Sequence, residues 1–249
     1  MFKNVKLVIF DMDGTIYLGS KLIDGANEVI NYVRSTGRKV CFLTNNSTKT
    51  RTQIYEKIRK LGVECTEKDI FTSGYTATIY LKKHSIKNVY VCGSDDIKHE
   101  FEQEGVSVAT EQDAKNLFIG YDISFNYEKL TRAFHVAQKA NKIIVANIDA
   151  FYPGENGVLY PGCAAMVGAI EYSIRRKSDI IIGKPNTLML EIISLQYNVN
   201  NNEILIIGDN YESDIIMAKE NDSPSILIGD SREGTTCVQN ILELLNMIN

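Results

Sequence analysis

Residues 7–15 read Leu7-Val8-Ile9-Phe10-Asp11-Met12-Asp13-Gly14-Thr15, an unbroken apolar run that is followed at once by acids and a glycine. A short apolar run without alternation is typical of a strand that is buried on both faces of a parallel sheet. Such a strand would present Asp11 at its carboxyl end, which is where ligands bind in open parallel sheets. Gly14 would let the chain turn sharply just afterwards, where a side chain would clash.

Short apolar runs alternate with segments of helical period along the rest of the chain, which predicts a parallel sheet flanked by helices. Helices are predicted at 26–36, 50–61 and 187–197, and Gly37 and Gly62 follow the first two as stop signals. Strands are predicted at 6–10, 39–43, 88–92, 116–120, 142–146, 180–182, 203–207 and 225–228.

The motifs that could carry chemistry are spread unevenly. They occupy 11–15 and 44–46, and comparable ones return only at 183–185 and 208–214. The long stretch between them has a β-α pattern of its own, which indicates a second domain inserted into the first. We therefore expect an inserted domain at residues 80–178 and a first domain formed by residues 1–79 and 179–249.

The composition of the chain limits the kinds of partner and the cellular location that we expect. The chain has 249 residues, of which 44% are hydrophobic, and its net charge is −4. With no long basic stretch we expect small-molecule partners and no nucleic acid. No apolar run approaches the length of a membrane span, and the first ten residues lack the features of a signal peptide. The five scattered cysteines form no C-x-x-C pair, which argues against a disulfide framework or a zinc site and fits a cytoplasmic protein.

Two acidic strand ends suggest a metal site. Asp11 and Asp13 would repel each other unless a cation lay nearby, and Mg²⁺ prefers such hard oxygen ligands. The apolar run 204–207 also ends in acids, with Asp209 next and Asp214 shortly after, so Asp209 is the expected third ligand. Each motif alone has a simpler reading, as an Asp-Gly turn at Asp11 or as a helix N-cap at Asp214.

Two further motifs could bind phosphate. Thr44-Asn45-Asn46-Ser47 follows a predicted strand and precedes a predicted helix, so its hydroxyl and N–H groups could meet phosphate oxygens. An ordinary polar loop with a helix cap would read the same way. Lys184 follows another strand and could neutralise both Asp11 and the developing charge of a phosphoryl group.

In this order, the motifs resemble the four motifs of the haloacid dehalogenase (HAD) superfamily: Asp11–Thr15, Thr44–Asn46, Gly183–Pro185, and Gly208–Asp209 with Asp214. The inserted segment resembles the type-two α/β cap of the p-nitrophenylphosphatase-like, or NagD-like, subgroup through residues 43–47, 147–149 and 159–162. The resemblance implies an α/β fold, with a three-layer Rossmannoid core around a parallel sheet and a smaller inserted α/β cap that sets specificity.

The resemblance also implies a role for each site residue. Asp11 would attack phosphorus to form an aspartyl-phosphate, and Asp13 would act as the general acid and base. Mg²⁺ would be held by Asp11, the backbone carbonyl of Asp13, and Asp209, with Asp214 ordering the outer shell. Substrate would contact Thr44, Asn45, Asn46, Lys184, Asn147 and Asp149.

The expected function is magnesium-dependent hydrolysis of a small phosphate monoester, such as a nucleotide, a sugar phosphate or phosphoglycolate. Relatives of this type often dimerise through the cap, so a homodimer is a further expectation. A phosphotransferase or mutase using the same intermediate remains an alternative, as does a non-catalytic phosphate-binding protein. The sequence departs from the family at residues 146–149, which read Ala-Asn-Ile-Asp instead of Thr-Asn-Pro-Asp, and in a short segment after residue 229.

Overall fold

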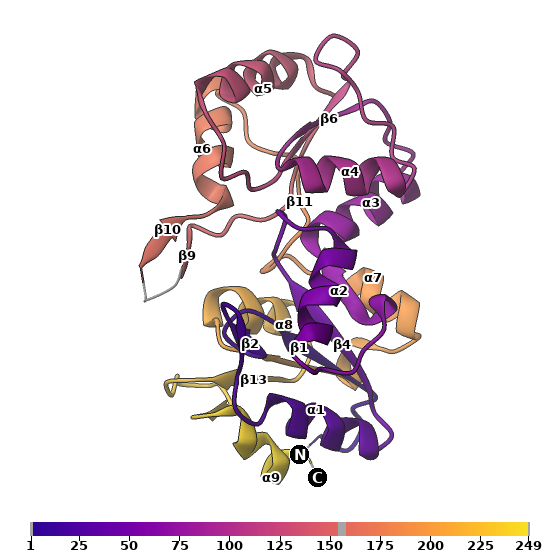
Figure 1. The fold of residues 1–249 in the computed structure, drawn as a ribbon, viewed down its shortest axis with the longest axis vertical. Helices are drawn as coiled ribbons and strands as arrows, with labels where there is room; N and C mark the ends of the chain where they lie inside the picture. The colour runs from indigo at the N-terminus through magenta and orange to yellow at the C-terminus, as the bar shows by residue number, and fades with distance from the viewer. Residues whose placement is uncertain (1, 154–157, 249) are drawn as a thin grey trace. The chain divides into compact units, whose positions relative to one another are not determined.

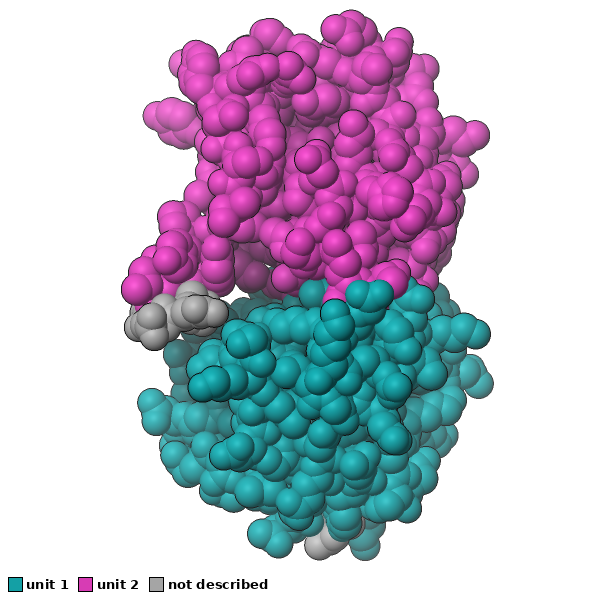
Figure 2. Space-filling model, viewed as in Figure 1, with its two compact units in different colours: residues 1–44, 54–71, 184–249 teal, residues 45–53, 72–183 magenta. Residues whose placement is uncertain are grey.

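The computed structural model describes residues 2–153 and 158–248, and its chain divides into two compact units. The first unit comprises Met1–Thr44, Ile54–Phe71 and Lys184–Asn249, and the second comprises Asn45–Gln53 and Thr72–Gly183. Figure 2 shows the first unit in teal and the second in magenta. Each unit has its own parallel sheet and its own hydrophobic core.

The sheet of the first unit has six strands in the order β14-β13-β12-β1-β4-β5 (Figure 1). Strand β1 pairs in parallel with both β4 and β12, so the sheet continues from β1 on both sides and the order of the strands reverses there. Open α/β sheets bind ligands at such a switch point. The strands are β1 (Leu7–Asp11), β4 (Lys39–Thr44), β5 (Ile70–Thr72), β12 (Ile204–Gly208), β13 (Ser225–Ile228) and β14 (Cys237–Val238), with a small hairpin of β2 (Tyr17–Leu18) and β3 (Lys21–Leu22).

Helix α1 (Ala26–Ser35) covers the sheet through one apolar stripe. Its buried residues recur at the spacing of one helical face, namely Ala26, Val29, Ile30 and Val33. They share one core cluster with Val8 and Phe10 of β1 and with Ile54 and Ile58 of α2 (Arg51–Lys60). The other helices of this part of the chain are α7 (Leu188–Tyr197), α8 (Ile216–Glu220) and α9 (Leu244–Met247).

The second unit has a four-stranded parallel sheet in the order β11-β8-β7-β6. Its strands are β6 (Val89–Cys92), β7 (Asn116–Ile119), β8 (Lys142–Val145) and β11 (Ile180–Ile181), and β9 (Phe151–Pro153) pairs with β10 (Leu159–Pro161) in a separate hairpin. Its helices are α3 (Ser73–Lys83), α4 (Asp95–Gln103), α5 (Tyr127–Lys139) and α6 (Cys163–Ile174). Helices α5 and α6 bury apolar side chains in one cluster with β7 and β8.

The second unit extends beyond the expected insertion at 80–178, because it also takes in 45–53, 72–79 and 179–183. Hydrogen bonds explain why the first of these segments, 45–53, belongs to the second unit. The Ser47 hydroxyl accepts from the Tyr121 N–H at 3.0 Å, and the Ser94 hydroxyl donates to the Thr48 carbonyl at 2.9 Å. The polar loop after β4 therefore belongs to the second unit, although it directly follows a strand of the first.

The predicted α/β fold with a parallel sheet is confirmed. All eight predicted strands and all three predicted helices are present, with their ends shifted by at most one residue. Six strands were not predicted, because they have two or three residues each and are too short to show a hydrophobic period: β2, β3, β5, β9, β10 and β14. Among the described residues, no helix combines the length and the apolar character that crossing a membrane requires.

Candidate active site

The carboxyl ends of three neighbouring strands form the centre of the first unit's site. Asp11, the last residue of β1, lies opposite Leu43 of β4, and Phe10 lies opposite Ile207 of β12. Thr44 therefore ends β4 beside Asp11, and Asp209 follows directly on the other side. Asp11 and Thr44 are 7% and 4% exposed, so the edge of the sheet holds them in a packed environment.

Lys184 lies between two buried carboxylates. Its Nζ is 2.5 Å from Oδ1 of Asp11 and 2.6 Å from Oδ1 of Asp214. Burial by itself would lower the pKa of Lys184, but Asp11 and Asp214 outweigh it and raise that pKa above its usual value. The ammonium is therefore charged at neutral pH and fixes the orientation of both acids.

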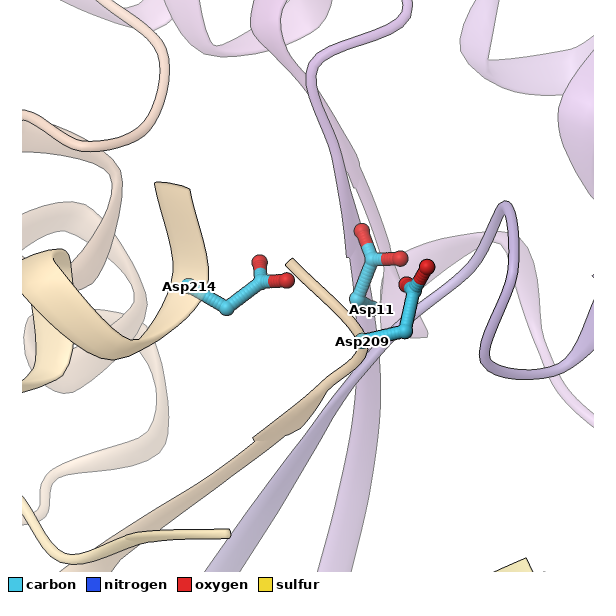
Figure 3. A group of neighbouring side chains, drawn as sticks. All are labelled: Asp11, Asp209 and Asp214. Atoms are coloured by element: carbon cyan, nitrogen blue, oxygen red, sulfur yellow. The ribbon is translucent and has the colours of Figure 1, made fainter. Parts of the chain in front are cut away.

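The acids nevertheless outnumber this single cation. Asp11, Asp209 and Asp214 each have a carboxylate oxygen within 4.8 Å of the others (Figure 3). Burial is the main cause that raises the pKa of Asp11 to about 7 and that of Asp214 to about 6, against the opposing effect of Lys184. Burial, followed by the charge of Asp214, also raises the pKa of Asp209. This surplus of hard oxygen donors fits a divalent cation such as Mg²⁺.

Asp209 is exposed, and two residues of the β1 loop orient it. The Thr15 hydroxyl donates to Oδ1 of Asp209 at 3.1 Å. Gly14 has a φ of +93°, and a Cβ on it would collide with the Asp209 carboxylate. The Gly14 N–H also donates to the Tyr17 carbonyl at 2.8 Å, which closes the loop. Glycine is thus required both by the backbone conformation and by the close approach of Asp209.

Asp214 is fully buried in a short helical turn, η4 (Tyr211–Ile215). The N-cap of this turn is Asn210, whose side chain accepts from the N–H groups of Glu212 and Ser213. The alternative reading of Asp214 as an N-cap is therefore wrong. Its carboxylate instead pairs with Lys184 and accepts from the Asn210 N–H at 3.2 Å.

Asp13 is more exposed to solvent than Asp11, and Tyr17 contacts it. The Tyr17 hydroxyl donates to Oδ2 of Asp13 at 2.9 Å. Protein groups around the carboxylate desolvate it and raise its pKa, whereas Lys57 and Tyr17 act in the opposite direction. The sequence alone predicted no role for Thr15, Tyr17 or Lys57. The position of Thr15 next to Asp11 and Asp13 could have suggested a role in the site. Tyr17 resembled an ordinary core aromatic residue, and Lys57 resembled an ordinary surface cation of a helix.

The remaining predicted site residues come together in the second unit. The Asn45 side chain donates to Oδ1 of Asp149 at 2.9 Å, and the Asn147 side chain donates to the Asn45 carbonyl at 2.7 Å. Asn46 Oδ1 accepts from the Thr48 N–H at 3.0 Å. The predicted residues thus form two sets, since Asp11, Asp13, Thr44, Lys184, Asp209 and Asp214 belong to the first unit. A substrate-binding role of the second set stays a prediction.

Two family models match separate parts of the chain, and known proteins resemble most of its length. Residues 8–107 match a family model described as haloacid dehalogenase-like hydrolase, and residues 181–240 match one described as HAD-hydrolase-like. The chain is 35% identical over 231 residues to sugar-phosphatase AraL of Bacillus subtilis, covering 91% of this chain and 85% of that protein. It is 30% identical over 246 residues to glycerol-3-phosphate phosphatase of Rattus norvegicus, covering 87% and 76%. The structure of 4-nitrophenylphosphatase from Thermotoga maritima matches with a TM-score of 0.92 and 28% identity, covering 99% of this chain and 98% of that one.

Proposed function

Because this chain belongs to the haloacid dehalogenase-like hydrolase family, we propose that it hydrolyses a small phosphate monoester through an aspartyl-phosphate on Asp11, with Mg²⁺ as cofactor. The relatives reported above are phosphatases, which supports a phosphatase of the p-nitrophenylphosphatase-like, or NagD-like, subgroup. The observation that carries the mechanism is the buried Lys184 ammonium between Asp11 and Asp214, with Asp209 at the next strand end.

In the first step, a carboxylate oxygen of Asp11 attacks phosphorus while the bond from phosphorus to the leaving oxygen breaks. Asp13 gives its proton to that leaving oxygen. In the second step, Asp13 takes a proton from a water molecule whose oxygen attacks phosphorus, and the Asp11 carboxylate is released. Lys184 keeps Asp11 oriented throughout and offsets charge that develops on the phosphoryl oxygens.

Asp11, Asp209 and the backbone carbonyl of Asp13 would hold Mg²⁺, with Asp214 ordering the outer shell. When bound, the ion supplies positive charge that lets a phosphate dianion approach three carboxylates. Thr44, buried at the end of β4, would help to bind the phosphate.

The second unit would act as the cap that selects the leaving group. Its polar set of Asn45, Asn46, Asn147 and Asp149 is the proposed neighbourhood of substrate contacts. Sugar phosphates are the first substrate class to test, since the relative with 35% identity is a sugar phosphatase. Phosphoglycolate and nucleotide monophosphates follow, and dimer formation through the cap remains a prediction.

The decisive experiment compares the wild type with Asp11→Asn, using p-nitrophenyl phosphate and a panel of small phosphate esters with Mg²⁺. We expect the variant to keep the wild-type circular dichroism spectrum and to lose turnover by more than about a thousandfold. Rapid acid quench of the wild type should trap phosphate on Asp11, located by mass spectrometry.

Asp24→Asn is the matched control, because Asp24 is an exposed acid of the same unit outside the site. Mass spectrometry should also exclude deamidation of the Asp11→Asn protein. Turnover by that variant near the wild-type rate would show that Asp11 is not the nucleophile. Phosphate transfer to an added alcohol or sugar that exceeds hydrolysis would identify a phosphotransferase instead.

A further inference from the structure

Tyr17 carries a buried hydroxyl that the core does not require. The residue is 0% exposed and belongs to the hydrophobic cluster that also contains Ile54 and Ile58 of α2. Phenylalanine would fill the same space, and burying a hydroxyl costs free energy unless it is hydrogen-bonded. Its bond goes to Oδ2 of Asp13, an exposed carboxylate that water could solvate instead. The hydroxyl is therefore better explained by what it does to Asp13 than by packing.

The backbone holds these two side chains in a fixed relation. The Gly14 N–H donates to the Tyr17 carbonyl at 2.8 Å, and the Tyr17 N–H donates to the Met12 carbonyl at 3.1 Å. Asp13 and Tyr17 also form a β-bridge. These backbone hydrogen bonds fix the loop between Asp13 and Tyr17. The Tyr17 hydroxyl therefore reaches Asp13 from a buried side chain on a fixed backbone.

Lys57 of α2 completes the arrangement. Its Nζ lies 3.5 Å from the centre of the Tyr17 ring, within the range of a cation–π interaction. Basic side chains in the last turn of a helix also complement its dipole, which is the ordinary reading of Lys57. Arg59 and Lys60 occupy the same turn and are exposed, so they can serve that purpose. Lys57 differs from them because it is half-buried against Tyr17.

We propose that Tyr17 and Lys57 are positioning residues that hold Oδ2 of Asp13, so that Oδ1 carries the proton to the leaving oxygen. The inference rests on the proposed hydrolysis through Asp11 and Asp13. Lys57 acts one step further away, by holding the ring that carries the hydroxyl. Without the Tyr17 hydroxyl the exposed Asp13 side chain would sample other rotamers, and proton transfer depends on its placement.

Tyr17→Phe tests this role, because it removes the hydroxyl and keeps the ring. p-Nitrophenolate leaves without being protonated, whereas an alkoxide needs the proton of Asp13. We expect the loss of kcat/KM to be about tenfold larger for glycerol phosphate than for p-nitrophenyl phosphate. The comparison uses kcat/KM because that quantity reports the steps up to the first cleavage and excludes hydrolysis of the intermediate.

Tyr55→Phe is the matched control, since Tyr55 lies on α2 and packs against the same core, while the side-chain hydrogen bond of Asp13 is made by Tyr17. This variant should leave the ratio of the two kcat/KM values at the wild-type level. Lys57→Gln should shift the ratio in the same direction as Tyr17→Phe, and Lys57→Arg should restore most of it because the cation remains. Lys60→Gln controls for loss of a charge from the same helical turn.

An Asp13→Asn background separates positioning from a merely structural effect. If Tyr17 acts through Asp13, Tyr17→Phe should cause no further loss in that background. Equal losses for both substrates, or an undiminished loss in the Asp13→Asn background, would overturn the inference and leave the proposed function standing. A wild type without turnover, or an Asp11→Asn variant with full turnover, would overturn the function as well. If Tyr17→Phe fails to fold, the Lys57 pair decides the question.

Discussion

At the scale of single residues, the site is defined by an imbalance of charge. The one ammonium of Lys184 contacts Asp11 and Asp214, while Asp209 adds a third carboxylate nearby. Three acids around one cation leave a negative surplus. Burial raises the pKa of Asp11 to about 7 against the opposing effect of Lys184, and the charge of Asp209 adds to the rise. The same surplus of carboxylates would favour binding of the proposed divalent cation.

Gly14→Ala should weaken the proposed metal site specifically. Gly14 and Gly37 both have a positive φ, of +93° and +82°, so the backbone conformation alone should make alanine cost about 1–2 kcal/mol of folding free energy at either position. A Cβ at Gly14 would also collide with Asp209, whereas one at Gly37 would meet nothing within 4 Å. We expect Mg²⁺ to raise the thermal midpoint of the wild type and of Gly37→Ala, but much less that of Gly14→Ala.

The measurement is thermal unfolding of the three proteins with and without Mg²⁺. An equal Mg²⁺-dependent rise in Gly14→Ala and Gly37→Ala would contradict the assigned role of Gly14. It would also mean that Asp209 can move without loss of metal binding.

The sequence was informative about residues at strand ends and uninformative about the contacts around them. It placed Asp11 and Asp209 at strand ends of one sheet and Lys184 after another strand, and the structure brings the three side chains together. The strand before Lys184, β11, pairs with β8 in the sheet of the second unit, which the sequence did not predict. Their chemical roles stay predictions. The contact between Lys57 and Tyr17 joins residues that are distant in sequence, and it depends on how α2 packs against the sheet. No local pattern specifies such a packing.

At the scale of elements, the sheet follows from continuous apolar runs. Strand β1 is fully buried and lies between β4 and β12, as an unbroken apolar run predicts for a central parallel strand. Strand β14, with two residues at the edge of the sheet, has no such run. Its pairing with β13 is set by the tertiary structure and was not predictable from local sequence.

The end of α6 offers a test of electrostatics away from the site. Glu171 is 8% exposed, accepts from the Ser178 N–H at 2.7 Å and pairs with Lys177 at 2.8 Å. Burial would raise the pKa of Glu171, but the bonds from Lys177 and Ser178 outweigh burial and lower it. A carboxyl whose pKa is lower in the folded state stabilises the fold above its unfolded pKa. This stabilisation is lost as pH falls through the folded value.

Glu171→Gln should therefore be less stable than the wild type at pH 7, by about 1–3 kcal/mol. The difference should shrink as the pH falls below the usual pKa of a glutamate, about 4.3, and through the lower folded value, because the wild-type carboxyl then becomes protonated. Urea unfolding across this pH range measures it. Glu128→Gln is the control, because Glu128 pairs with Arg132 on the surface and such pairs contribute little. A difference between Glu171→Gln and the wild type that stays constant with pH would refute the charge-based account.

At the scale of the whole molecule, the site joins distant parts of the chain within one unit. Asp11 and Lys184 are 173 positions apart, and all of the second unit lies between them in sequence. The sequence predicted such an insertion from the spacing of the motifs. It could not predict where the second unit begins, because residues 45–53 belong to it through hydrogen bonds to loops that are remote in sequence.

This organisation predicts where bound Mg²⁺ should act. The proposed ligands Asp11 and Asp209 belong to the first unit, whereas β7 and β8 have a core of their own in the second. Because a ligand stabilises the state that binds it, Mg²⁺ should slow amide hydrogen exchange most in β1, β12 and η4. Exchange in β7 and β8 should change much less.

In the same hydrogen-exchange experiment, Ile143→Ala tests whether the core of the second unit and the proposed metal site of the first unit respond independently. Ile143 is fully buried in β8, so its truncation should destabilise the second unit by about 2–5 kcal/mol and speed exchange in β7 and β8. The Mg²⁺-dependent protection of β1 and β12 should persist in this variant, because its proposed ligands are unchanged. Asp209→Asn should show the reverse pattern, with normal exchange in β7 and β8 and little Mg²⁺-dependent protection of β1. Equal protection of both sheets by Mg²⁺ in the wild type, retained in Asp209→Asn, would place the metal elsewhere in the chain.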